Sequence, residues 1–172
     1  SLRHASYNTA ALRALQILAP AAVKITLANI GELPLFNPDR AEESIPSLAV
    51  LKAALRQASG LIIASPEYAH GISGPLKNAL DWLVSGEEFP AIPIMLVNTS
   101  PRAHHALDAL KEVLRTMSGK LVDAAEVAIP LLGSGLDANG IVADPAMTKT
   151  LQSALHAFCD KIRELRVESG SG

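Results

Sequence analysis

The chain has 172 residues, of which 49% are hydrophobic and 19% charged, and this composition predicts a single domain with an extensive apolar core rather than a disordered chain. Fifteen basic against 17 acidic side chains give a formal net charge of −2, which provides no basic surface for a nucleic acid. Cys159 is the only cysteine, so an internal disulfide and a zinc site built from thiolates are excluded.

Sequence features that direct a protein to a membrane are missing from the printed chain. No apolar run reaches the roughly 18 to 20 residues of a membrane span, and the first residues lack the basic and then apolar pattern of a signal peptide. We therefore expect no membrane insertion and, with one cysteine, a reducing cytoplasmic compartment.

Apolar runs of strand length alternate along the chain with longer segments of helical period, which is typical of β-α-β units and a parallel sheet. The expected helices and strands cover, in chain order, helix 7–18, strand 23–28, helix 45–58, strand 61–65, helix 75–84, strand 94–98, helix 103–117, strand region 120–129 and helix 145–167. Residues 61–64 are apolar at every position, as in a strand that is covered on both faces. We predict a doubly wound α/β domain over residues 1–168 and a flexible tail at 169–172.

A doubly wound sheet needs a strand before its first helix, yet Ser1-Leu2-Arg3 is loop-like and almost adjoins the expected helix at 7–18. Loss of a central strand would leave two rows of unpaired backbone groups, and each buried unpaired group costs about 1 to 3 kcal/mol. We expect the first strand to be missing from the given sequence rather than from the fold. A return of residues 166–169 to that position is disfavoured.

The segment SLRHASYN (residues 1–8) carries Ser1, Arg3, Ser6 and Asn8 at or before the first turn of a helix. A helix N-terminus offers unpaired N–H groups and a positive dipole end, hydroxyl groups add donors, and an Arg side chain matches the oxygens of a phosphate. The segment therefore predicts an anion-binding loop. An ordinary N-cap at Ser6 with a solvated Arg3 explains the same residues equally well.

A second loop, residues 66–74, lies between the most apolar strand and a helix that begins near Pro75. Ligand-binding loops of open α/β sheets lie at this carboxyl end of the strands. The sequence Pro66-Glu67-Tyr68, followed by Gly71, can place backbone N–H groups along a planar heterocycle such as a flavin, whose reduced ring such donors stabilise.

The strings SLRHASYN and SPEYAHGISGPLKNALDW (residues 65–82) closely resemble the NADPH-dependent FMN reductases, a family that includes quinone, chromate and azo-dye reductases. The resemblance covers nearly the whole chain, including IGELPLFNPD at residues 30–39. It implies a flavodoxin-like, three-layer α/β/α fold, FMN as cofactor, and NADPH or NADH as electron donor. It assigns the FMN phosphate to Ser1, Arg3, Ser6 and Asn8, and the flavin ring to Pro66, Glu67, Tyr68, Gly71 and Ser100.

The third flavin loop of the family carries a Ser and then a Gly-Gly pair, whereas this chain has NTSPRAHHALDAL, with His104 and His105 at that place. These histidines contact the flavin or the nicotinamide phosphate, begin a solvated helix, or bind a metal ion. Adjacent helical residues point about 100° apart, which disfavours a shared metal ion, and we predict no metal site. We assign His104 and His105, together with His70, to the substrate pocket.

Other residues of these motifs receive structural interpretations. Lys77, Asn78 and Asp81 are interpreted as structural, with Lys77 and Asp81 an i,i+4 pair on one helix face, and Trp82 is assigned to packing or an interface. Cys159 lies in an amphipathic segment and is expected to pack as a small apolar residue. The segment LLGSGLDANG (residues 131–140) matches no nucleotide-binding motif and is predicted to be a turn and surface loop.

The resemblance implies an oxidoreductase in which NAD(P)H reduces FMN and leaves before a quinone or another small acceptor enters. No side chain is assigned a catalytic role, because the flavin carries the chemistry. The family also implies a homodimer or homotetramer. The alternatives are a flavodoxin-like electron carrier, which a net charge of only −2 disfavours, and a flavin-free scaffold or regulatory oligomer that has lost its cofactor through the altered third loop.

Overall fold

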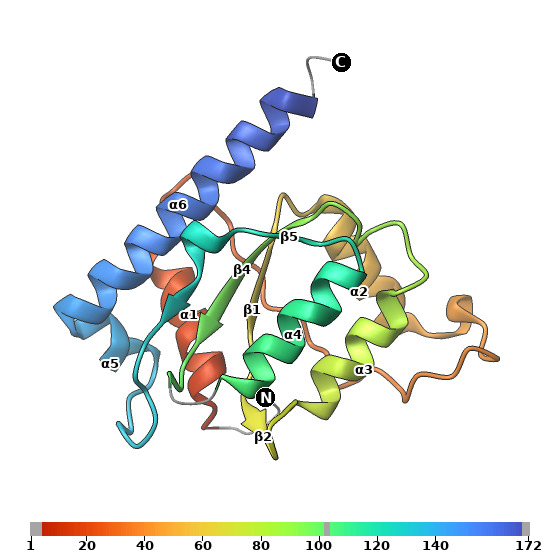
Figure 1. Cartoon of the computed structure of the whole chain (residues 1–172), viewed down its shortest axis with the longest axis horizontal. Helices are drawn as coiled ribbons and strands as arrows, with labels where there is room; N and C mark the ends of the chain where they lie inside the picture. Colours follow the sequence, from red (N-terminus) through yellow and green to blue (C-terminus); the bar gives the residue numbers. More distant parts are fainter. Residues whose placement is uncertain (1–4, 102–103, 170–172) are drawn as a thin grey trace.

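The computed structural model describes residues 5–101 and 104–169 and contains a four-stranded parallel sheet (Figure 1). Strand β4 (Pro93–Asn98) is at its centre and pairs on one side with β1 (Leu61–Ala64). On its other side β4 pairs with β5 (Lys120–Leu121) and, further along, with β6 (Val127–Ala128). The predicted parallel α/β sheet is confirmed.

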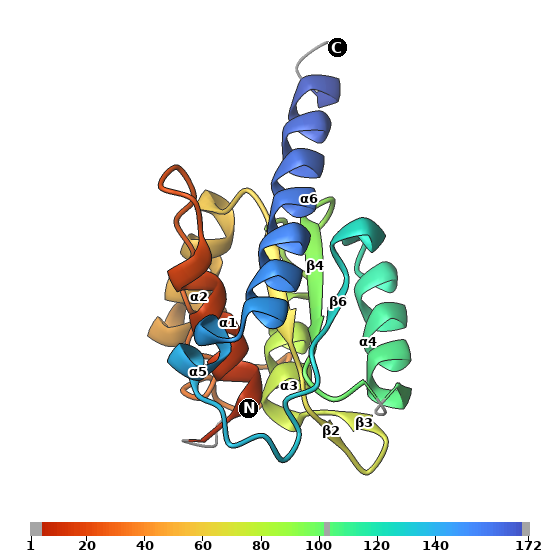
Figure 2. The same cartoon turned by 90° about the vertical axis from the view of Figure 1, so that its left-hand side faces the viewer.

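Helices cover both faces of this sheet, and the side chains of β4 alternate between two apolar clusters. Ile94 and Leu96 belong to a core with α2 (Pro46–Gln57), α3 (Gly74–Leu83) and α4 (His105–Thr116). Met95 and Val97 belong to a second core with α1 (Tyr7–Leu18), α5 (Ala138–Ala143) and α6 (Pro145–Ser169). The result is the three-layer α/β/α arrangement expected from the sequence (Figures 1 and 2).

The strand predicted for residues 23–28 is wrong, because this segment has no strand partner in the described part of the chain. Its side chains do alternate: Val23, Ile25 and Leu27 are half-buried while the residues between them are exposed. Ile25 packs on the core beneath α1, and its carbonyl accepts a hydrogen bond from Gln16 Nε2 at 2.8 Å. Alternation records which side chains are buried, but a strand also needs a hydrogen-bonded neighbour.

Strand β1 pairs with β4 alone among the described strands, so it is an edge strand of the sheet. Its pattern of burial reflects this position, since Ile63 is buried and the other three residues are half-buried. Leu61 and Ile63 pack into one core while Ile62 and Ala64 pack into the other, so this apolar strand is covered on both faces as expected.

Two regions of the structure differ in detail from the elements predicted for them. The strand region 120–129 is divided by a 3₁₀ turn (Asp123–Ala125), which buries Ala125 completely in the core beneath α6 and separates β5 from β6. The loop predicted for residues 131–140 ends early, because α5 begins at Ala138. Asp137 caps this short helix by accepting a hydrogen bond from Gly140 N at 2.8 Å.

The side chains of Asn78 and Trp82 join α3 to the loop that precedes the 3₁₀ turn Glu42–Ser44. Asn78 accepts a hydrogen bond from Phe36 N and donates one to Pro34 O, at 2.8 and 2.9 Å. The buried Trp82 ring also donates to Pro34 O, at 2.8 Å, and packs edge-on against Phe36. These contacts agree with the structural interpretation of both side chains.

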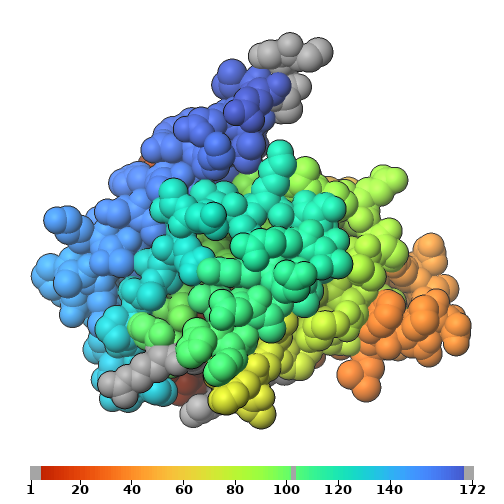
Figure 3. All heavy atoms as spheres, viewed as in Figure 1, coloured from red at the N-terminus to blue at the C-terminus, as the bar shows by residue number. Residues whose placement is uncertain are grey.

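Helix α6 is the longest helix described, with 25 residues, and its final turns project beyond the rest of the molecule (Figures 1 to 3). The projecting end carries charged residues such as Lys161, Arg163 and Glu164. Among the helices of residues 5–101 and 104–169, none is both long and apolar enough to cross a membrane.

Candidate functional site

Three segments meet at the carboxyl end of the sheet. They are the first turn of α1, the segment that follows β1, and the segment that follows β4. A buried hydrogen bond joins two of them directly, because Thr99 Oγ1 donates to Asn8 Oδ1 at 3.1 Å. The segment that follows β1 is joined to the start of α4, because Glu67 accepts a hydrogen bond from Ala106 N. Helix α4 begins after the loop that contains Thr99. The sheet thus brings together the loops that the sequence singled out.

The start of α1 combines a helix cap with a buried amide. Ser6 is the N-cap, and its Oγ accepts a hydrogen bond from Thr9 N at 3.3 Å, so the ordinary N-cap interpretation is confirmed for this residue. The hydroxyl hydrogen of Ser6 and the amide N–H groups of Asn8 can still donate to another group. Ser1 and Arg3, the other two residues assigned to phosphate binding, lie outside the described residues.

The predicted loop 66–74 contains a small antiparallel hairpin, formed by β2 (Glu67–Tyr68) and β3 (Gly71–Ile72). Its two turn residues, Ala69 and His70, both have positive φ, at 48° and 61°. A two-residue hairpin turn of this kind normally contains Asn and Gly, because other residues are strained there. The sequence Ala-His therefore gave no signal for the turn.

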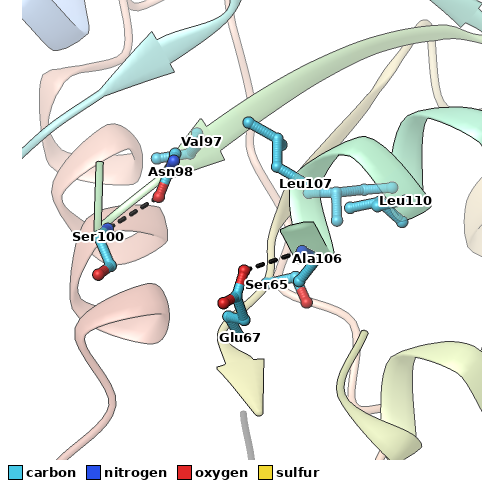
Figure 4. Close-up of a pocket in the computed structure, with 9 residues that line it drawn as sticks. Ser65, Glu67, Val97, Asn98, Ser100, Ala106, Leu107 and Leu110 are labelled. Atoms are coloured by element: carbon cyan, nitrogen blue, oxygen red, sulfur yellow. Dashed lines mark hydrogen bonds between the residues drawn. The ribbon is translucent and has the colours of Figure 1, made fainter. Parts of the chain in front are cut away.

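Glu67 fastens this hairpin to the first turn of α4. Its Oε2 accepts a hydrogen bond from Ala106 N at 2.9 Å, while His104, the N-cap residue of α4, makes no side-chain cap bond (Figure 4). The carboxylate satisfies an N–H group at the positive end of the helix dipole. The Glu67 side chain thus holds the hairpin against the start of α4. A contact of Glu67 with the flavin ring would therefore be made by its backbone.

A small cavity lies between the hairpin and the loop that follows β4 (Figure 4). Its volume of about 20 Å³ suits one water molecule and is far too small for a flavin ring. It is lined by Ile63, Ser65, Glu67, Val97, Asn98, Ser100, Ala106, Leu107 and Leu110. Asn98 Oδ1 accepts a hydrogen bond from Ser100 N at 2.8 Å and so shapes the start of the loop.

The three histidines assigned to the substrate pocket form a stack of rings at the surface. The centroids of His70 and His105 are 4.2 Å apart with 21° between the ring planes, and those of His104 and His105 are 4.3 Å apart with 32° between them. All three residues are exposed. The described residues contain no group of three or more His, Cys, Asp or Glu residues arranged to hold a metal ion.

Some residues of this site were not recognised from the sequence. The sequence marks Thr99 only as part of the altered third loop, yet the side chain is buried and donates a hydrogen bond to Asn8. Asn98 and Ser65 are expected as the ends of strands, and the structure places both in the lining of the cavity. Their position at the carboxyl ends of two adjacent parallel strands was the available signal. Pro66, Tyr68 and Gly71 lie on or beside the hairpin.

Comparisons with known proteins identify relatives of similar length. Residues 1–133 match the family of NADPH-dependent FMN reductases. An NAD(P)H-dependent FMN reductase of Pseudomonas aeruginosa is 32% identical over 172 residues, which cover 96% of this chain and 93% of the relative. A 2-hydroxy-1,4-benzoquinone reductase of a Burkholderia species is 32% identical over 97% of this chain and 94% of the relative. A quinone reductase of Escherichia coli is 28% identical with the same coverage.

A solved structure has the same fold over almost the entire chain. FerB, a flavoenzyme NAD(P)H:(acceptor) oxidoreductase from Paracoccus denitrificans, superposes with a TM-score of 0.84 at 29% identity and covers 95% of this chain and 93% of its own. The predicted flavodoxin-like fold is confirmed by this match. The chain belongs to the NADPH-dependent FMN reductase family, and it is an oxidoreductase whose cofactor is FMN and whose electron donor is NAD(P)H.

Proposed function

We propose that this protein reduces quinones or similar small acceptors by a ping-pong cycle, in which NAD(P)H leaves before the acceptor enters the same site. The observation that carries the proposal is the convergence of three loops at the carboxyl end of the sheet, held together by the Thr99–Asn8 and Ala106–Glu67 hydrogen bonds. Several relatives are named quinone reductases, which supports this class of acceptor.

The described residues have the chemistry that FMN requires. The first turn of α1 offers N–H groups, a hydroxyl at Ser6 and a buried amide at Asn8, which suit a phosphate group. The family resemblance adds Ser1 and Arg3 to these phosphate-binding residues. The ring is assigned to Pro66, Glu67, Tyr68, Gly71 and Ser100, largely through their backbone. When bound, FMN accepts a hydride from NAD(P)H and passes two electrons to the acceptor.

FMN binding is tested by the absorption spectrum of the purified protein after FMN is added and the mixture is desalted. A flavin band that stays with the protein supports the proposal, and its absence at micromolar concentration contradicts it. Asn8→Ala is expected to weaken FMN binding about tenfold, since it removes a hydrogen bond to a charged group. Asn29→Ala, an exposed position on another loop, is the matched control and should leave the affinity unchanged.

The order of the two substrates is tested by steady-state kinetics. When NAD(P)H and a quinone share one site in turn, double-reciprocal plots at several quinone concentrations are parallel. Intersecting lines would mean that both substrates are bound together and would contradict the ping-pong cycle. Turnover with purified components alone also separates an enzyme from an electron carrier, which would need a partner protein.

The family resemblance extends the proposal to assembly and location. We place the protein in the cytoplasm and expect it to be a homodimer or homotetramer. The exposed Leu35, at 85% of its full accessibility, lies on the loop that Asn78 holds against α3 and is available for such a contact. Sedimentation equilibrium at micromolar concentration tests the assembly, and a monomer at all concentrations would contradict it.

A further inference from the structure

Reduction of a quinone needs one proton more than NAD(P)H supplies. NAD(P)H contributes a hydride, which is two electrons and one proton, whereas conversion of a quinone to its hydroquinone consumes two electrons and two protons. The second proton has to come from water or from a side chain near the acceptor. A side chain that exchanges protons near neutral pH is suited to this task.

The stack of His70, His105 and His104 is the group of the described site that meets this requirement. Imidazole is the side chain that gains and loses a proton between pH 5 and 8. The stack lies where the hairpin contacts the start of α4, and all three histidines are exposed. Water can therefore restore a proton that one of these rings has given away.

Other titratable groups on the same elements are poorly suited to donate a proton. The nearby carboxyl groups belong to Glu67 and Asp108, and Glu67 already accepts the hydrogen bond from Ala106 N. Tyr68 is exposed, and a phenol is in general a weaker acid than an imidazolium ion. The hairpin and the first turn of α4 contain no Lys or Arg.

The geometry distinguishes His70 from its two neighbours. The His105 ring contacts both of the others, stacked on His70 and tilted against His104. His70 is an outer ring, and it is the only one carried by the hairpin that contains Tyr68 and Gly71. Its positive φ of 61° places it in the turn at the tip of the hairpin.

We infer that His70 is a catalytic residue that donates a proton to the quinone, an inference that rests on the proposed function. As the hydride equivalent arrives, negative charge develops on a carbonyl oxygen of the acceptor. The N–H bond of protonated His70 breaks, the proton forms an O–H bond with that oxygen, and the imidazole becomes neutral. Two electrons and one proton from NAD(P)H and one proton from His70 balance the formation of hydroquinone.

The test compares a quinone with ferricyanide, which accepts electrons without forming a bond to a proton. In the FMN-loaded protein, His70→Asn is expected to lower kcat/KM for the quinone about 10- to 100-fold at pH 7 and to change ferricyanide reduction less than twofold. Asn tolerates positive φ, so the hairpin turn is kept. His156→Asn, at an exposed position on α6, is the matched control and should change neither rate.

The pH profile and a rescue experiment distinguish proton donation from a structural role. With the unmodified protein, quinone reduction is expected to slow as the pH rises, because proton donation needs the imidazolium form, whereas the His70→Asn rate should depend much less on pH. Added imidazole should restore part of the quinone activity of this variant. FMN affinity, measured by fluorescence quenching, should be equal in both proteins.

Three results would overturn the inference. They are an unchanged quinone rate in His70→Asn, an equal loss of quinone and ferricyanide reduction, and a weakened FMN affinity that accounts for the loss. Failure of the unmodified protein to bind FMN or to reduce ferricyanide with NAD(P)H would instead overturn the proposed function, and with it the inference. The two failures are therefore distinguishable.

Discussion

Asn8 and Thr99 show how one buried pair determines the shape of the site. Both residues are only 5% exposed, and the Thr99 hydroxyl is the donor to Asn8 Oδ1. Thr99→Val is expected to lower the free energy of unfolding by about 1 to 3 kcal/mol, because it leaves this buried oxygen without its donor. Urea denaturation measures the change. Thr116→Val, which removes an exposed hydrogen bond within α4, should change stability by about 0.5 kcal/mol or less.

The environment of Cys159 predicts how fast its thiol reacts with alkylating reagents. Burial raises the pKa of its thiol, Asp160 raises it further, and the charge of Arg163 opposes them in part. Because the reactive thiolate forms only as the pH approaches a raised pKa, the folded protein should react more slowly with iodoacetamide at pH 8 than glutathione does. Urea should remove the difference. Equal rates in the folded state would contradict a protected, packing role for Cys159.

At the scale of elements, the β2–β3 hairpin is the least conventional part of the fold. Ala69 has a φ of 48°, a conformation that costs an ordinary residue roughly 1 to 2 kcal/mol but that Asn adopts readily. Ala69→Asn is therefore expected to stabilise the protein by about 1 kcal/mol. Urea midpoints measure the change, and Ala22→Asn, at an exposed turn residue without positive φ, should give no gain. A loss of stability at position 69 would show that the hairpin turn is not strained.

At the scale of the whole molecule, the sheet separates two apolar cores. Ile94 and Ile141 are completely buried, the first beneath α2 to α4 and the second beneath α1 and α6. Ile94→Val and Ile141→Val should each cost about 0.5 to 1.5 kcal/mol in unfolding free energy. Since the two side chains share no core, the costs in the double variant should add to within about 0.5 kcal/mol. A larger deviation would show that the cores are coupled through the sheet.

Some elements of the fold can be predicted from the sequence and others cannot. Helices α1, α2, α3 and α6 were recognised within two residues of their observed ends, because their apolar periodicity and flanking Pro or Ser residues are local signals. The hairpin was missed because Ala69-His70 lacks the residues that its turn type favours. The segment 23–28 was assigned as a strand because alternation does not report a hydrogen-bonded partner.

The sequence by itself determined the parallel α/β class, the two loops at the carboxyl edge and the family, since these depend on local periodicity and on motifs read along the chain. Only the tertiary structure decided that Thr99 holds Asn8, that Glu67 caps α4, and that the three histidines of the site stack. These contacts join residues 35 to 91 positions apart, apart from the adjacent pair His104 and His105. Such pairings follow from how the elements pack, and no local sequence signal records them.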